Sequence, residues 1–259
     1  MKTKTLLALT LGMLLALGAC KKKQEPTQAD DSTNTNANTT IGQHMAPYAV
    51  GDVVFTDGSA SAWNAGEFTD VQKQAAVAYI FYSGTELNDN DDTRVRTLGV
   101  GFKTEKLPWC IEGAAGYDLH FDNIEQSVRN GSNHLALMAQ FLGENDDTDE
   151  EGYYPAFHYC KNYKDIEDSR VAGTSMEDGW YLPSLAEMKQ VYGHMATLVD
   201  ITTACGNGFF LAEDWLTATQ GFMPSWPSSH TKGACYQTNG TYGIRDKATV
   251  TRFCAIREF

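Results

Sequence analysis

The sequence predicts an α+β fold for the body of this chain, because strand-like and helix-like patterns occupy separate stretches. A strand pattern covers residues 48–56 and ends in the turn signal Asp57-Gly58. Two further apolar runs, 75–82 and 97–102, are expected to pair as antiparallel strands, with the acidic segment 88–92 at the tip of their connection. Helical periodicity fills the middle of the chain, and short strands and loops return toward its end.

Three segments carry helical patterns. Residues 122–142 are expected to be divided by Asn130-Gly131-Ser132, and 154–163 predicts a short helix. The strongest pattern is 184–199, where Ser184 and Glu187 have the spacing of a capping box. Its apolar face is formed by Leu185, Met188, Val191, Tyr192, Met195 and Leu198. Residues 250–259 are then expected to form the closing strand.

The first twenty residues resemble a bacterial lipoprotein signal. Lys2 and Lys4 precede an apolar run at 6–17, and Leu17-Gly18-Ala19 leads into Cys20. The run is shorter than the roughly 20 apolar residues that span a bilayer. We therefore expect residues 1–19 to be cleaved and Cys20 to carry acyl chains such as palmitate. The alternative is an ordinary secretory signal followed by an incidental cysteine.

Residues 20–46 are almost purely polar after the cysteine, which predicts a disordered stalk, and 47–259 then form the folded domain. The chain has a formal net charge of −13. Nucleic acid is an unsuitable partner for it, because phosphate binding needs a basic surface. Contact with the membrane is expected through the lipid anchor alone, since no later apolar segment is long enough to cross a bilayer.

Five segments, taken in order, resemble the Lcl-type C-terminal domain of bacterial surface proteins, a family similar in fold to C-type lectins and formylglycine-generating enzymes. The sharpest of them is Gly-Trp-Tyr-Leu-Pro-Ser followed by Leu-Ala-Glu-Met. The resemblance covers most of 47–259 and implies a C-type-lectin-like domain with antiparallel strands, two main helices and long irregular loops. The segments are Gly51–Gly58, Tyr154–Cys160, Gly179–Met188, Trp215–Thr219 and Arg252–Arg257.

Five cysteines remain after Cys20, so at least one is unpaired within the molecule. The resemblance implies a disulfide between Cys160 and Cys254, since an early helix is often joined to the last strand in C-type-lectin-like folds. Cys205 and Cys235 would then close a loop of about 30 residues, and Cys110 is left over. The alternative is that all of them are buried thiols.

Catalytic motifs are absent from the sequence. It contains no G-x-S-x-G elbow, no H-E-x-x-H helix and no P-loop. Formylglycine-generating enzymes use a cysteine pair, for which Cys235 and Cys254 are the candidates, but the residues flanking them do not reproduce a catalytic pattern. The sequence therefore favours a protein that is not an enzyme.

We expect a ligand-binding surface on the loop-rich region 206–244, where aromatic residues lie among small polar ones. Alternatively, these aromatic rings pack the loops onto the sheet. Glu213, Asp214 and Asn239 are loose candidates for sugar ligands. The candidate ligand-binding residues are Phe209, Phe210, Trp226, Tyr236 and Asn239.

No cofactor is predicted, although two acidic loops, 88–92 and 144–151, have compositions that calcium can use. Solvated loops are the simpler interpretation of both. Together these patterns predict a lipid-anchored protein of the bacterial envelope, placed at the outer membrane, which presents a binding or adhesion module for a glycan or protein. A formylglycine-generating type of enzyme and a purely structural envelope component are the alternatives.

Overall fold

The computed structural model describes residues 40–89, 91–119, 129–134, 136–137, 140, 151–206, 208–209, 213–221 and 230–259. Its strands are β1 (Asp52–Phe55), β2 (Ala60–Ala62), β3 (Ala76–Gly84), β4 (Arg96–Leu107), β5 (Trp180–Tyr181), β6 (Trp215–Gln220), β7 (Lys232–Tyr236), β8 (Tyr242–Asp246) and β9 (Thr251–Glu258). Its helices are α1 (Asp70–Ala75), α3 (Pro155–Lys161), α4 (Leu185–Gly193) and α5 (Met195–Ala204), with 3₁₀ turns η1 (Gly131–Asn133) and η2 (Tyr163–Asp165).

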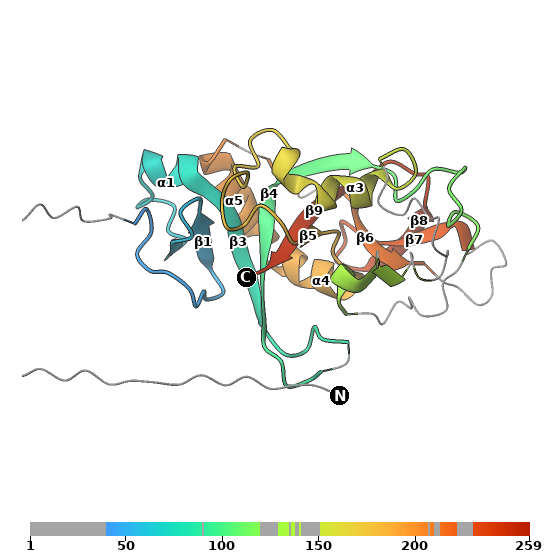
Figure 1. Ribbon diagram of the computed structural model, residues 1–259, viewed down its shortest axis with the longest axis horizontal. Coiled ribbons are helices and arrows are strands. Elements are labelled where there is room, and N and C mark those ends of the chain that lie inside the picture. The colour runs from blue at the N-terminus through green and yellow to red at the C-terminus, as the bar shows by residue number, and fades with distance from the viewer. Residues whose placement is uncertain are drawn as a thin grey trace, which may run out of the picture. The chain divides into compact units, whose positions relative to one another are not determined.

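Within the described ranges the strands join in one sheet with the order β2-β1-β3-β4-β9-β6-β7-β8, and β5 also pairs with β9 (Figure 1). Neighbouring strands run antiparallel except β6 and β9, which run parallel where Trp215 lies beside Arg252. The last strand of the chain therefore lies in the middle of the sheet. It joins the long β3–β4 hairpin to the three strands of the C-terminal part.

The α+β prediction is confirmed, and most expected elements are present. Residues 75–82 and 97–102 fall in β3 and β4, which pair antiparallel as predicted, for example at Ala78 and Gly101. In place of one helix over 184–199 there are two: α4 ends at Gly193, and α5 begins at Met195. Residues 122–128 lie outside the described ranges, and η1 begins at Gly131, where a break was predicted.

The sheet has two buried faces. Along β9, Phe253 and Ala255 belong to one apolar cluster, and Cys254 and Ile256 belong to another, as the two-residue period of a strand requires. The first cluster contains buried hydrophobic residues of α3, among them Phe157 and Cys160, and we call this side the α3 face. The second contains those of α4 and α5, and we call it the α4 face.

Two glycines of β4 allow aromatic rings to lie directly on the α3 face. A Cβ atom at Gly101 would lie 2.4 Å from the hydroxyl oxygen of Tyr163, and one at Gly99 would lie 2.6 Å from the ring of Phe259. The Tyr163 hydroxyl accepts a hydrogen bond from the backbone N–H of Lys103 at 2.8 Å. Both contacts fix η2 and the C-terminus against the sheet.

The beginning of α4 is held by a capping box and a buried arginine. Ser184 accepts a hydrogen bond from the Glu187 N–H, and Glu187 accepts one from the Ser184 N–H, as the sequence predicted. The Glu187 carboxylate also accepts hydrogen bonds from Arg96 at 3.1 Å, Tyr181 at 2.9 Å and the Gly131 N–H at 2.9 Å. Arg96 donates to Glu258 at 3.1 Å as well. We call Arg96, Tyr181, Glu187 and Glu258 the Arg96 cluster.

Hydropathy gives one further result. Among the residues that the structure describes, none of the helices combines the length and the apolar character needed to cross a membrane.

Candidate functional site

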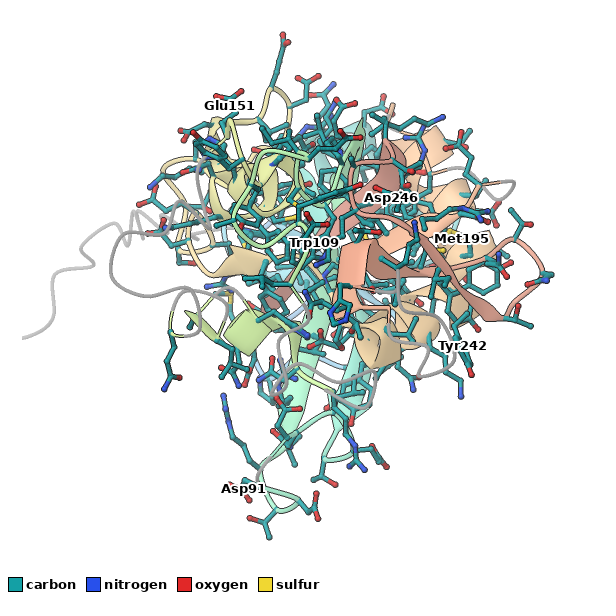
Figure 2. All side chains as sticks on the ribbon, turned by 90° about the vertical axis from the view of Figure 1, so that its right-hand side faces the viewer. Asp91, Trp109, Glu151, Met195, Tyr242 and Asp246 are labelled. Atoms are coloured by element: carbon teal, nitrogen blue, oxygen red, sulfur yellow. The ribbon has the colours of Figure 1, made fainter. Side chains whose placement is uncertain are left out.

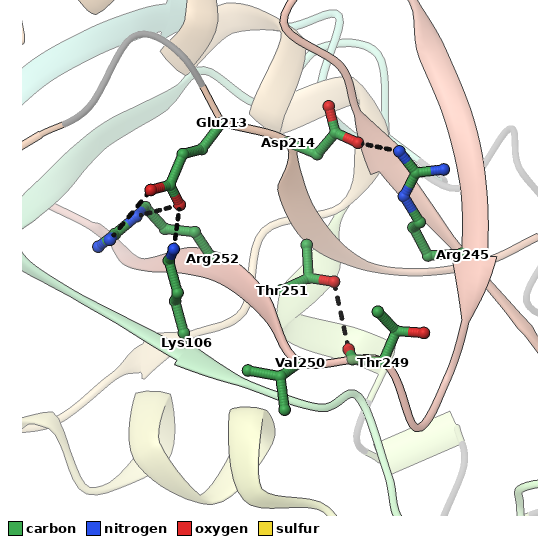
Figure 3. A pocket seen from close by; sticks show the side chains of 8 residues that line it. All are labelled: Lys106, Glu213, Asp214, Arg245, Thr249, Val250, Thr251 and Arg252. Carbon is green, nitrogen blue, oxygen red and sulfur yellow. Dashed lines mark hydrogen bonds and ion pairs between the residues drawn. The ribbon is translucent and has the colours of Figure 1, made fainter.

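A charged recess with a volume of about 340 Å³ lies at the end of the sheet where β4 stops and β9 starts (Figure 3). Its lining is polar apart from one valine and comes from four segments of the fold. We call it the charged recess. The residues that line it are Lys106, Glu213, Asp214, Arg245, Thr249, Val250, Thr251 and Arg252.

Sheet topology brings these residues together. Lys106, near the end of β4, is the direct cross-strand partner of Arg252, near the start of β9. Since β6 runs parallel to β9, its beginning lies at the same end of the sheet, and this places Glu213 and Asp214 beside that pair. Arg245 comes from β8 at the sheet edge. Residues distant in sequence therefore converge because of strand order.

Glu213 organises one side of the recess. Its carboxylate accepts a hydrogen bond from Arg252 Nε at 2.8 Å and lies 3.0 Å from Lys106 Nζ. Arg252 also donates to the Thr104 hydroxyl at 2.9 Å. The hydrogen bond from Arg252, together with Lys106, holds the pKa of the Glu213 carboxyl below its ordinary value. This carboxylate therefore stays ionised between its two cations.

Asp214 and Arg245 form an ion pair on the other side, and Thr251 lies between the two groups (Figure 3). The second carboxylate oxygen of Asp214 accepts the Thr238 N–H at 3.3 Å. Thr251 donates its hydroxyl hydrogen to the Thr249 carbonyl at 3.2 Å, which leaves the hydroxyl oxygen able to accept. The exposed Val250 side chain, at 59%, adds an apolar wall.

This arrangement is suited to binding. Three cations and two carboxylates line the recess, so it has donors and acceptors of both charges and a formal charge of +1 in a chain of net charge −13. The lining includes neither histidine nor cysteine among the residues that the structure describes. These side chains can hold and orient a polar ligand through charge-assisted hydrogen bonds.

A second hollow, of about 360 Å³, runs along α3. Its wall is more apolar, with Leu107, Pro155 and Ile166, and its charged groups are the carboxylates of Glu151 and Asp165. Its described lining also includes His158 and contains neither lysine nor arginine. The charged recess therefore has the more specific chemistry of the two.

The aromatic residues that the sequence assigned to ligand binding have packing roles where they are described. Phe209 is 4% exposed and stacks on Trp215 with ring centroids 5.2 Å apart. Tyr236 is 8% exposed, packs on Tyr192, and donates its hydroxyl to the Gly240 carbonyl at 2.8 Å. Both rings thus pack against the α4 face, and a role of these two residues in ligand binding stays a prediction.

The remaining candidates of that region divide into two groups. Phe210 and Trp226 lie outside the described residues. Asn239 lies in the β7–β8 turn, where its side-chain oxygen accepts hydrogen bonds from the Thr241 N–H and hydroxyl. Tyr242 of β8 is a further aromatic residue of this region. Its side chain is 63% exposed, and the sequence analysis did not select it.

Neither expected disulfide is present. Cys110, Cys160, Cys205, Cys235 and Cys254 are all free and buried, and burial raises the pKa of each thiol. Cys20 lies outside the described residues.

The two faces of the sheet explain why these cysteines do not pair. Cys160 belongs to the α3 face, whereas the alternation of β9 directs Cys254 to the α4 face. Cys205 also lies on the α4 face, whereas Cys235 is the cross-strand partner of Leu216, an α3-face residue. Each expected bond would have to cross the sheet.

The acidic loop 88–92 uses its described side chains locally. Asp91 accepts hydrogen bonds from Thr93, Asp89 accepts them from the Arg129 and Asn130 N–H groups, and Asn88 donates to backbone carbonyls. Figure 2 shows Asp91 at the far tip of the β3–β4 hairpin. No group of three metal-ligating side chains occurs in the described ranges, and residues 144–150 lie outside them. Calcium binding was the less favoured interpretation of these loops, and it stays untested.

The sequence pointed to part of the recess. Glu213 and Asp214 were candidates for sugar ligands, and both line it. Lys106 and Arg245 were missed, because nothing local distinguishes a strand-end lysine or an edge-strand arginine from a solvated charge. The strand order β4-β9-β6-β7-β8 places both residues at the same end of the sheet.

Comparison with known proteins gives one structural relationship. No protein-family model matches the sequence, and no curated protein matches it. The crystal structure of a fimbrial protein from Bacteroides ovatus is similar to this chain, with a TM-score of 0.57 and 13% sequence identity. The similarity covers 82% of this chain and 49% of that chain, so this chain spans about half the length of the fimbrial protein. At such low identity the likeness shows a shared fold.

Proposed function

We propose that this protein is a lipid-anchored protein of the bacterial envelope, placed at the outer membrane, whose folded body binds a polar ligand in the charged recess. The body is a C-type-lectin-like domain of the Lcl type, and the polar residues that follow Cys20 hold it away from the lipid surface. Residues 40–46, which the sequence assigned to the stalk, belong to the folded body, where the His44 N–H donates to the Ala60 carbonyl at 3.1 Å and the Ala60 N–H donates back to the His44 carbonyl at 2.7 Å. The role is adhesion or ligand capture.

Two observations support the location. The residues before Cys20 have the order of a lipoprotein signal, and the fold is similar to that of a fimbrial protein, a class that works at the cell surface. A polar segment of about 20 residues would reach on the order of 25 Å as a flexible coil, which clears lipid headgroups.

The observation that carries the binding role is the charged recess itself. Its ion pairs connect loop and strand ends of a rigid sheet, and recognition commonly uses such positions. Lys106 and Arg245 are 47% and 44% exposed, so their charges are accessible to a ligand. A purely structural role would not require them to be open to solvent.

The test is capture of ligands by the full chain on an array of glycans and matrix proteins. The double variant Lys106→Gln/Arg245→Gln should lose capture while its melting temperature stays within about 2–4 °C of wild type, the shift expected for about 1 kcal/mol. The matched control is Lys164→Gln, which removes an exposed pair with Asp178 outside the recess. Equal capture by both variants and wild type would refute the recess as the binding site.

Lipidation is tested separately. Cys20→Ser should release the protein from membranes or block its maturation, and it should abolish acyl labelling. Unchanged fractionation with unchanged acyl label would contradict the anchor. This result does not depend on the recess.

The alternative of a formylglycine-generating type of enzyme needs two cysteines in an open cleft. Cys235 and Cys254 are buried, and burial raises the pKa of the Cys235 thiol to about 11 and that of Cys254 further. A buried thiol of high pKa is a poor nucleophile. These two side chains also lie on opposite faces of the sheet, so the binding role has the better support.

A further inference from the structure

The second hollow, along α3, has a lining that differs in kind from that of the charged recess, and we call it the α3 hollow. Its residues from α3 and the C-cap of that helix are three or four positions apart, so they lie along one side of the helix. A helix of this length is about 10 Å long. These residues are Pro155, His158, Tyr159 and Asn162, and the rest of the lining is Leu107, Glu151, Asp165 and Ile166.

Tyr159 brings to the α3 hollow a polar atom that the protein itself does not use. Its side chain is 9% exposed, and its ring packs edge-to-face on Phe253 with centroids 5.1 Å apart. Among the residues that the structure describes, none forms a hydrogen bond with the Tyr159 hydroxyl, and the oxygen is not enclosed by protein. Since this side chain lines the α3 hollow, its hydroxyl opens into that space. Burial raises the pKa of the hydroxyl, so it stays protonated.

The other polar groups of the α3 hollow are acceptors. Neither the Glu151 nor the Asp165 carboxylate has an ion-pair or hydrogen-bond partner within the described ranges. Asn162 donates its side-chain nitrogen to the His158 carbonyl at 3.0 Å, which leaves its side-chain oxygen able to accept. The described lining therefore offers oxygen acceptors without a lysine or an arginine to neutralise them.

We propose that the α3 hollow binds a linear aliphatic amine, with its ammonium group accepted by oxygens of the lining and its methylene chain against the apolar wall. An ammonium has three donors and no acceptor, which complements a set of acceptors. The wall that would contact the methylene groups consists of Leu107, Pro155, Ile166 and the ring of Tyr159. This site is separate from the charged recess, so the inference does not depend on the proposed function.

Other classes of small ligand fit less well. An anion would face the carboxylates of Glu151 and Asp165 with no lysine or arginine among the described lining residues. An uncharged apolar molecule would cover the Tyr159 hydroxyl and give it no partner, which costs free energy. No group of three metal-ligating side chains occurs in the described part of the chain. The volume of about 360 Å³ is near the lower end of the roughly 300–1,000 Å³ found for ligand pockets.

The experiment is NMR titration of the full chain in detergent, following the methyl signals of Leu107 and Ile166. The probes are pentylamine, pentan-1-ol, which has the same chain without the charge, and methylamine, which has the charge without the chain. Pentylamine should shift both signals and should bind at least about tenfold more tightly than either analogue, because each analogue loses one of the two contacts. The methyl signals of Val250, in the charged recess, should stay unchanged.

Variants locate the bound ammonium at the same detergent concentration. Glu151→Gln/Asp165→Asn should weaken pentylamine binding about tenfold or more. The matched control Glu67→Gln/Glu167→Gln removes two exposed carboxylates outside the lining and should leave the affinity unchanged.

Tyr159→Phe keeps the ring and removes only the hydroxyl, so pentylamine binding should weaken by about two- to tenfold, the range for one hydrogen bond. Asp214→Asn, in the charged recess, should leave it unchanged. Absence of shifts at Leu107 and Ile166, pentan-1-ol binding as tight as that of pentylamine, or wild-type affinity in the double carboxylate variant or in Tyr159→Phe would overturn the inference. None of these results bears on capture by the charged recess.

Discussion

Arginine and glutamate side chains contact each other both in the Arg96 cluster and in the charged recess. The centre of the Arg96 cluster is sealed beneath α4, whereas the charged recess is open at the end of the sheet. In the Arg96 cluster, Arg96 and Glu187 have fully buried side chains. In the charged recess, Arg252 is 12% exposed and Glu213 is 29% exposed. The residue types and contact distances are similar, but the access of solvent is different.

This difference assigns the two clusters different roles. Every oxygen of the Glu187 carboxylate faces a donor from the protein itself: a guanidinium, a phenol and two backbone N–H groups. Burial raises the pKa of this carboxyl, and the facing guanidinium and N–H groups oppose that effect. Such a site has no place for a ligand. The open cluster keeps donors and acceptors directed toward solvent, which is what recognition requires.

The largest expected effect is at the centre of the sealed cluster. Arg96→Met leaves Glu187 without its cation in a buried position and should lower the free energy of unfolding by about 3–5 kcal/mol. Thermal unfolding measures this loss. The matched control is Arg94→Gln, which removes an exposed pair with the same Glu258 and should cost about 1 kcal/mol or less. Equal losses for the two variants would contradict the sealed role.

An intermediate effect is expected at Glu258, the half-exposed member of the Arg96 cluster. Its side chain is 30% exposed and pairs with both Arg94 and Arg96. Glu258→Gln should lower the free energy of unfolding by about 1–3 kcal/mol, because a hydrogen bond to a charged group is lost while Glu187 remains. Denaturant unfolding gives the value. A loss as large as that of Arg96→Met would mean that solvent exposure does not determine how much each of these contacts contributes to stability.

A small effect on stability is expected in the recess. Arg245→Gln removes a pair whose members are 44% and 19% exposed, so the free energy of unfolding should change by about 1 kcal/mol or less. The same denaturant measurement applies, with Lys164→Gln as the control. A loss above about 3 kcal/mol would place Arg245 among the structural residues and remove the contrast between the clusters.

The smallest effect concerns pH. Because the pKa of Glu213 in the folded protein lies below its ordinary value of 4.5, its stabilising contribution is present above that value. It is lost as the pH falls through the lowered folded value. The difference in stability between wild type and Glu213→Gln should therefore shrink over the acidic interval below about pH 5, where the folded carboxyl takes up its proton. A difference that is constant over this interval would show that Arg252 and Lys106 do not stabilise the carboxylate.

Local patterns predicted what local chemistry determines. The capping box of Ser184 and Glu187 and the β3–β4 pairing follow from spacing and alternation, and both were predicted correctly. The additional role of Glu187 as the acceptor for Arg96 could not be predicted, because these two residues are brought together only by the sheet. The same limit applies to Lys106 and Arg252, which are cross-strand partners separated by most of the domain.

The free cysteines and the buried aromatic rings differ from the sequence expectations for another reason. The resemblance to C-type-lectin-like folds implied a bond between Cys160 and Cys254. The two-residue period of β9 decides the face on which each side chain lies, and it directs Cys254 away from the α3 face that holds Cys160. An aromatic ring in a polar stretch of sequence, such as Phe209 or Tyr236, can either anchor a loop or bind a ligand. Only their burial distinguishes the two roles.

The most direct test of the contrast between the clusters is NMR observation of the arginine Nε–Hε signals in the full chain, recorded while a component captured on the array is added. The signals of Arg245 and Arg252 should shift or broaden as the recess fills, and the signal of Arg96 should stay unchanged. A shift of the Arg96 signal without any change at Arg245 and Arg252 would contradict the assignment of binding to the charged recess.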